Sequence, residues 1–216
     1  MLLRIESYEV SLVGKIRVLY FLEDRAQEGF IKSLVKKVAK EESIPDGYLY
    51  HDIRSARGGS RIINEFRKFL SNIEKMDISE LDIILIVSLD GNCKGYNERV
   101  KQLDKYIKED NPFKNKVIYA IPDPHIERWY LMDQKALKSG IGLVKVPKLP
   151  PYKCKKSYYK QLLNNTLKES NVTSLLSGAE YAERIVDCIE KLEVLSRQDV
   201  GFKIFIKDLR RMFRKS

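Results

Sequence analysis

Short apolar runs alternate with helix-length amphipathic stretches from Lys15 to about Leu137, and this alternation limits the fold more than any other feature. The runs are rich in β-branched and aromatic residues, and two are almost uninterrupted, which is typical of strands buried on both faces of a parallel sheet. The stretches between them, such as residues 26–40, place apolar residues at helical spacing. We therefore expect an α/β fold, a mostly parallel sheet flanked by helices. The expected strands cover residues 16–22, 48–53, 82–89 and 117–121.

The pattern changes after Leu137, beyond which no further strand is expected. Pro147, Pro150 and Pro151 indicate an irregular connection, because proline disfavours a helical conformation in the residue before it. Three helices are expected after it, over residues 155–169, 178–196 and 202–214. We predict an α/β domain at residues 1–140 and a basic helical extension at residues 141–216 that packs on it.

The 216 residues include 40 lysines and arginines against 30 aspartates and glutamates, which gives a net charge of +10. This balance favours a polyanionic partner. With 44% hydrophobic and 32% charged residues, the chain is neither a disordered nor a collagen-like polymer. No apolar run approaches the roughly 20 residues that a membrane-spanning helix needs, so no membrane partner is expected.

The three cysteines, Cys93, Cys154 and Cys188, are odd in number and far apart in the sequence. Such spacing predicts neither a disulfide framework nor a cysteine zinc site. The beginning of the chain also lacks the features of a secretory signal. We therefore expect the reducing cytoplasm as the compartment.

Acidic residues follow three of the expected strands. Because the carboxyl ends of parallel strands meet at one edge of a sheet, we expect these side chains to lie close together. Clustered carboxylates repel one another and usually coexist where a cation compensates them. Oxygen ligands without cysteine or histidine clusters suit Mg²⁺ or Mn²⁺ better than zinc. The acids at the strand ends are Glu23, Asp24, Asp90 and Asp123, with Glu28 and Glu127 one helical turn further on.

Each of these acids also has an ordinary structural explanation. Glu23, Asp24 or Asp90 taken alone could cap or begin a helix, where the helix dipole favours a negative charge. Glu28 could be a solvated helix residue. His125 is more typical of a structural or turn residue than of a ligand.

Three short segments, in this order along the chain, resemble motifs of TOPRIM-like domains. The first expected strand and the run EDRAQE at residues 23–28 resemble the opening motif, in which one acid follows the strand and another lies on the next helix. Residues 85–92, LIVSLDGN, are similar to a later strand that ends in Asp-x-Asp. Residues 121–133 are similar to the Glu-x-Trp-x-Leu segment of TOPRIM-like proteins of uncharacterised function. Those proteins are related to nucleases of overcoming-lysogenization-defect and anti-phage systems.

The resemblance covers roughly residues 15–140. It implies a TOPRIM-like Rossmannoid fold and a Mg²⁺- or Mn²⁺-dependent site for phosphodiester chemistry. Either Glu23 or Asp24 would be the first acid, since the glycine that usually follows this acid is missing, and Asn92 would stand in the place of the second acid of Asp-x-Asp. The implied metal ligands are Glu23, Asp24, Asp90 and Asn92, and the implied catalytic residues are Glu23, Glu28 and Glu127.

Lysines without any acid fill the stretch from Gly142 to Lys168, and three tyrosines lie among them. Basic residues interleaved with aromatic residues suit a polynucleotide, with lysines on phosphates and rings available for stacking. The alternative is a solvated, lysine-rich face. A second basic cluster extends from Lys203 to Lys215. The predicted nucleic-acid contacts are Arg57, Arg61, Lys145, Lys148, Lys153, Lys155, Lys156 and Lys160, and the tyrosines are Tyr152, Tyr158 and Tyr159.

These observations favour a cytoplasmic, metal-dependent nuclease of DNA or RNA that serves in defence against phages or mobile elements. The alternative is a non-catalytic subunit that binds nucleic acid or an ATPase partner through the same surfaces, and the neutral Asn92 favours it. A phosphoryl-transfer enzyme acting on a nucleotide is a third interpretation. ATP hydrolysis by this chain alone is disfavoured, because the turn at residues 57–61 lacks the Gly-Lys-Ser/Thr ending of a Walker loop.

Overall fold

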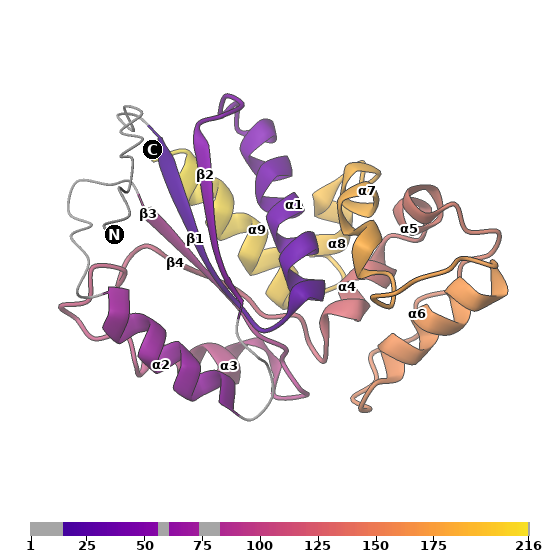
Figure 1. The fold of residues 1–216 in the computed structure, drawn as a ribbon, viewed down its shortest axis with the longest axis horizontal. Coiled ribbons are helices and arrows are strands. Elements are labelled where there is room, and N and C mark those ends of the chain that lie inside the picture. Colours follow the sequence, from indigo (N-terminus) through magenta and orange to yellow (C-terminus); the bar gives the residue numbers. More distant parts are fainter. Residues whose placement is uncertain (1–14, 56–60, 74–82, 216) are drawn as a thin grey trace, which may run out of the picture.

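A computed structural model of the chain describes residues 15–55, 61–73 and 83–215. Within these ranges four strands form one sheet in the order β2-β1-β3-β4, and every neighbouring pair is parallel. The expected α/β fold, a Rossmannoid parallel sheet flanked by helices, is confirmed (Figure 1). The strands are β1 (Ile16–Leu22), β2 (Leu49–Ser55), β3 (Ile83–Ser88) and β4 (Val117–Ala120).

The last residues of three adjacent strands lie in register. Leu22 of β1 pairs with Ser88 of β3, and Ser88 pairs with Ala120 of β4. The chain therefore leaves these strands at one edge of the sheet, which we call the carboxyl edge. The segments that follow the strands are brought together there, although they are far apart in the sequence.

A hydrophobic core covers each face of the sheet, because alternate residues of a strand point in opposite directions. The even-numbered residues of β1 face a core that includes α1 (Arg25–Glu41) and α9 (Val200–Phe213). Its odd-numbered apolar residues face a second core, beneath α2 (Ile62–Ile73) and α3 (Gly95–Asp104). Figure 1 shows these helix pairs on opposite sides of the strands.

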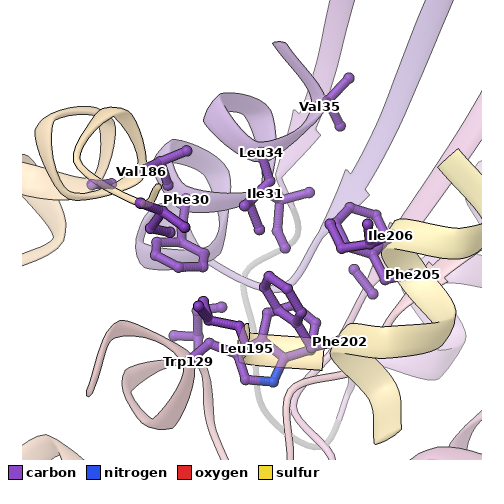
Figure 2. Packing of buried hydrophobic residues seen from close by; sticks show 14 of the residues in the cluster. Phe30, Ile31, Leu34, Val35, Trp129, Val186, Leu195, Phe202, Phe205 and Ile206 are labelled. Atoms are coloured by element: carbon purple, nitrogen blue, oxygen red, sulfur yellow. The ribbon is translucent and has the colours of Figure 1, made fainter. Parts of the chain in front are cut away.

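The first core joins early and late parts of the chain (Figure 2). Trp129 packs edge-on against Phe202 of α9, with ring centroids 5.1 Å apart, and Phe30 and Leu34 of α1 lie in the same cluster. Helix α9 also contacts β4, so it serves as a flanking helix of the sheet. The described parts of residues 1–140 and 141–216 thus share one core, and the division at residue 140 stays a prediction.

The chain between β4 and α9 forms a series of short helices. Asp133 separates two of them, because its side chain accepts a hydrogen bond from the Ala136 N–H and caps the second. The prediction of a single helix over residues 178–196 is wrong, since this stretch forms a 3₁₀ turn and two short helices. None of the helices in the described ranges is long and apolar enough to cross a membrane. The elements are α4 (Ile126–Met132), α5 (Gln134–Ile141), α6 (Tyr158–Glu169), η2 (Ala179–Tyr181), α7 (Ala182–Asp187) and α8 (Leu192–Ser196).

Candidate functional site

The junction between β1 and α1 places two of the predicted acids at the carboxyl edge. Glu23 continues the sheet ladder, because its N–H donates to the Ser88 carbonyl at 3.1 Å. Asp24 is the N-cap of α1, and its carboxylate accepts from the Gln27 N–H at 3.0 Å. Glu28 lies one helical turn later and is half-buried. The positive end of the α1 dipole therefore points at this edge and favours negative charge there.

Asp90, which follows β3, is the centre of the hydrogen-bond network at the carboxyl edge. Its backbone N–H donates to Glu23 Oε2 at 2.8 Å, which joins the ends of two strands. Its Oδ1 accepts from Gln27 Nε2 at 3.0 Å and from the Ile126 N–H at 3.2 Å. Its Oδ2 lies 3.0 Å from His125 Nδ1. Asp90 thus links β1, α1 and the start of α4.

Carboxyl groups from three segments interact electrostatically around Asp90. Burial raises the pKa of Asp24 and of Glu127, and the negative charge of Asp90 raises both further. The positive charge of Lys160 on α6 acts in the opposite direction and partly offsets both increases in pKa. The hydrogen bond to Asp90 raises the pKa of His125. We define the acidic cluster as Glu23, Asp24, Asp90 and Glu127.

The donor chemistry of the acidic cluster fits a hard divalent cation, because every ligand atom it offers is a carboxylate oxygen. The positions of these side chains, however, do not form a complete set of metal ligands. Across the described ranges, no group of three or more His, Cys, Asp and Glu side chains has the geometry to hold a metal ion. Asp90 already accepts three hydrogen bonds, and Asn92 is an exposed turn residue with φ of 48° whose side chain donates to the Asp90 carbonyl. The metal-ligand assignments therefore stay predictions.

Two residues of this network, Gln27 and the Asp90-bound His125, are not predicted from the sequence. Gln27 is fully buried and bridges the Glu23 N–H and the Asp90 carboxylate. A signal for it exists, because Gln27 precedes Phe30 by three residues on the apolar stripe of α1, where a polar residue needs a partner. The role of His125 depends on a contact across 35 residues, for which local sequence carries no signal.

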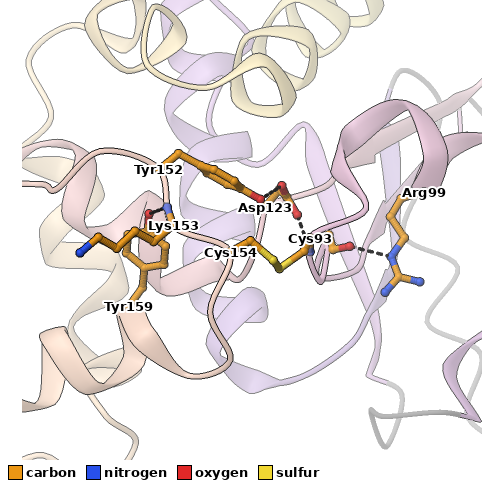
Figure 3. The surroundings of a disulfide bond; sticks show 8 residues. Cys93, Arg99, Asp123, Tyr152, Lys153, Cys154 and Tyr159 are labelled. Carbon is orange, nitrogen blue, oxygen red and sulfur yellow. Dashed lines mark hydrogen bonds between the residues drawn. A yellow bond between two sulfur atoms is a disulfide. The ribbon is translucent and has the colours of Figure 1, made fainter.

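A disulfide between Cys93 and Cys154 corrects the expectation from cysteine spacing (Figure 3). The two residues are 61 positions apart, but the loop after β3 and the connection after α5 meet at the carboxyl edge, where their Cα atoms are 5.5 Å apart. Cys188 is a free cysteine. Beside the disulfide, Asp123 accepts from the Cys93 N–H at 2.9 Å and from the Tyr152 hydroxyl at 2.6 Å.

The predicted nucleic-acid contacts lie on the surface wherever they are described. Among these residues, Lys160 lies near the acidic cluster, because its charge lowers the pKa of Asp24 and of Glu127. Tyr159 is fully buried, so the prediction that its ring is available for stacking is wrong. Arg57 lies outside the described residues. The exposed basic residues are Arg61, Lys145, Lys148, Lys153, Lys155, Lys156 and Lys160.

Part of the second basic cluster forms ion pairs with acids at the other end of α1 and on α8. Arg210 binds Glu41 at 2.7 Å and Glu193 at 2.8 Å, and Arg214 binds Glu42 at 2.7 Å. These two arginines are therefore engaged in ion pairs, and phosphate binding by the second basic cluster stays a prediction. We define the ion-pair cluster as Glu41, Glu42, Glu193, Arg210 and Arg214.

No model of a known protein family matches the chain, and neither the curated proteins nor the solved structures gave a match. The resemblance to TOPRIM-like domains therefore rests on its short motifs and their order, and the activity that it implies is a proposal.

Proposed function

We propose that this protein is a metal-dependent nuclease that hydrolyses phosphodiester bonds at the carboxyl edge of its sheet. The observation that carries the proposal is the meeting of acids from three separate segments around Asp90. Such a gathering leaves negative charge that a bound cation would compensate. The order of the TOPRIM-like motifs supports the same chemistry.

The acidic cluster would hold Mg²⁺ or Mn²⁺ through Asp90 and the acids after β1, Glu23 and Asp24, with Asn92 as a weaker neutral ligand. When bound, such an ion neutralises charge on a phosphate and activates water. Glu23 fixes Asp90 by accepting its N–H at 2.8 Å, and either Glu23 or Asp24 is the counterpart of the first TOPRIM acid. Glu127, whose pKa is raised by burial and by Asp90, is suited to accept a proton from water. Glu28, on the same side of α1 as Asp24, would orient that water.

The exposed lysines after α5 would hold the polynucleotide by its phosphates. Lys160 extends this basic surface to the acidic cluster, because its charge acts on both Asp24 and Glu127. We place the protein in the cytoplasm and its role in defence against phages or mobile elements. Thiol reductants keep most cysteines reduced in that compartment, so Cys93 and Cys154 would join there only under oxidising conditions.

One observation favours a second candidate function, a non-catalytic subunit that binds nucleic acid or an ATPase partner. Three internal hydrogen bonds to the Asp90 carboxylate, together with the neutral Asn92 in its turn, are what a site that has lost its metal would retain. The basic surface would then act without cleavage.

Cleavage assays separate the two functions. Labelled single-stranded DNA, double-stranded DNA and RNA are incubated with the protein in Mg²⁺, in Mn²⁺ and in EDTA. The nuclease proposal expects cleavage in at least one metal, none in EDTA, and none by Asp90→Asn, which keeps an oxygen for Gln27 and Ile126. Unchanged binding without cleavage in either metal supports the non-catalytic subunit instead.

A further inference from the structure

The connection after α5 crosses the carboxyl edge as a chain without helix or strand, from residue 142 to residue 157. We call residues 151–157 the lysine strap. Its lysines flank Cys154 in the sequence, and all of them are exposed. The disulfide thus brings a short, strongly basic segment to the loop that directly follows Asp90 (Figure 3). The lysines are Lys153, Lys155 and Lys156.

The loop on the other side of the disulfide is firmly held. Gly91 packs so closely against Asp123 that a Cβ atom there would lie 2.2 Å from Oδ1. Its carbonyl accepts from Arg99 Nε at 3.2 Å, and the Cys93 N–H donates to Asp123. The loop therefore provides a fixed anchor for Cys154 (Figure 3).

The strap also has noncovalent attachments, to Asp123, to Arg128 and to the start of α6. The Tyr152 hydroxyl donates to Asp123 at 2.6 Å, and its ring lies 5.7 Å from the Arg128 guanidinium carbon. The Lys153 N–H donates to the Tyr159 hydroxyl at 2.9 Å. The hydrogen bond from Tyr152 is exposed and contributes little, since water competes for both groups, whereas the bond to the buried Tyr159 attaches Lys153 to α6. The covalent bond is therefore the direct link between the strap and the loop after β3.

We propose that the Cys93–Cys154 disulfide fastens the lysine strap beside the acidic cluster as a nucleic-acid-binding surface, and that its reduction releases the strap and weakens binding. The inference rests on the proposed function only in taking nucleic acid as the polyanion. It requires no cleavage, so it also applies to a non-catalytic subunit.

Both cysteines are exposed, so a small dithiol can reach the bond. Exposed disulfides are also the ones most readily reduced. A thiolate of the dithiol attacks one sulfur, and the other cysteine leaves as a thiolate that takes up a proton. The second thiol of the dithiol then displaces the remaining cysteine as a thiol. Two electrons pass to the protein disulfide, which gives two cysteine thiols and the cyclic disulfide of the reagent.

Release of the strap is expected to leave α6 in place. Tyr159, Leu163 and Leu167 of this helix are buried in the first core, and α6 contacts α4. Lys160 therefore stays near the acidic cluster after reduction. The loss of binding should accordingly be partial and should come from the strap lysines.

The test measures the affinity of the full chain for a short fluorescein-labelled single-stranded DNA by fluorescence anisotropy, in EDTA and at several salt concentrations, before and after dithiothreitol. Each lysine–phosphate contact that is lost should weaken binding about fivefold at about 0.1 M salt and flatten the salt slope by about 0.7. Cys154→Ser and Cys93→Ser should reproduce the reduced protein and no longer respond to dithiothreitol. Cys188→Ser is the matched control and should behave as wild type.

Trypsin gives a readout that does not depend on DNA. Cleavage after the three strap lysines, located by mass spectrometry, should be faster in the reduced protein, while the circular dichroism spectrum stays unchanged. Equal cleavage rates in both redox states would show that the disulfide does not restrain the strap. DNA affinity and salt slope that are equal in both states, or an absence of DNA binding, would overturn the role of the strap as a binding surface. If dithiothreitol weakens DNA binding but the protein cleaves no substrate in either metal, the nuclease proposal is contradicted and this inference is supported.

Discussion

The two ends of α1 each gather carboxylates from distant parts of the chain, and the two gatherings differ in what surrounds the charge. At the carboxyl-terminal end, the hydrogen bond from Arg214 lowers the pKa of Glu42, and hydrogen bonds from its own backbone N–H and from Arg210 lower the pKa of Glu193. At the amino-terminal end, burial and the charge of Asp90 raise the pKa of Asp24 and Glu127.

The difference in pKa shift separates acids whose charged form the folded state stabilises from acids whose charged form it destabilises. In the ion-pair cluster the folded state favours the charged form of the carboxyl groups, which is the behaviour of a structural contact. In the acidic cluster the folded state disfavours charge on Asp24 and Glu127, and such strain is concentrated at functional sites. The following predictions test whether this division is correct.

The largest expected effect is on catalysis. Asp24→Asn keeps an N-cap for α1, since asparagine caps helices as well as aspartate, but removes a charge from the acidic cluster. We expect cleavage to fall at least about 100-fold. Glu42→Gln in the ion-pair cluster is the matched control and should cleave as wild type. An equal loss in both variants would mean that the two clusters do not differ in function.

A smaller effect is expected on stability when the ion-pair cluster is broken. Arg210→Gln removes contacts to Glu41 and Glu193 on two elements. Because both carboxylate partners are exposed, we expect the free energy of unfolding to fall by only about 1 kcal/mol, measured by urea denaturation. No change would show that these pairs are surface contacts without energetic weight.

In the acidic cluster, removal of a charge is expected to raise the free energy of unfolding. Glu127→Gln removes a charge that burial and Asp90 make unfavourable, while keeping the size of the side chain. In EDTA, the free energy of unfolding should therefore rise by about 0.5 kcal/mol, although cleavage is lost. A clear destabilisation would place Glu127 among the structural acids and break the comparison.

The smallest effect concerns pH. The lowered pKa of Glu42 means that its stabilising contribution is present above the unfolded value of about 4.3 and is lost as pH falls through the folded value. The stability difference between wild type and Arg214→Gln should therefore shrink between about pH 6 and about pH 3.5 in urea denaturation experiments. A difference that stays constant over this range would contradict an ionic role for Arg214.

Local pattern was enough to predict the sheet and the edge at which the acids meet. The β-branched run before Asp90 and the apolar run before Glu23 determine parallel, buried strands, and parallel strands bring their carboxyl ends together. The hydrogen bond from Asp90 to Glu23 follows from that register.

Contacts that depend on tertiary packing could not be predicted in the same way. The pairing of Gln27 with Asp90 spans 63 residues, and that of Cys93 with Cys154 spans 61. Neither pairing can be derived from a local sequence period, because each depends on where two segments far apart in the chain meet. The burial of Tyr159 is similar, since Lys155, Lys156 and Lys160 around it in the sequence are exposed and only its packing in the first core decides its environment.

The most direct test of the central claim is a titration of the metal-free protein with Mn²⁺ by isothermal titration calorimetry. Wild type should bind Mn²⁺, Glu42→Gln should bind it equally well, and Asp24→Asn should bind it at least about tenfold more weakly. If wild type binds no Mn²⁺ at millimolar concentrations, or if all three proteins bind it alike, the acids at the carboxyl edge are not a cation site.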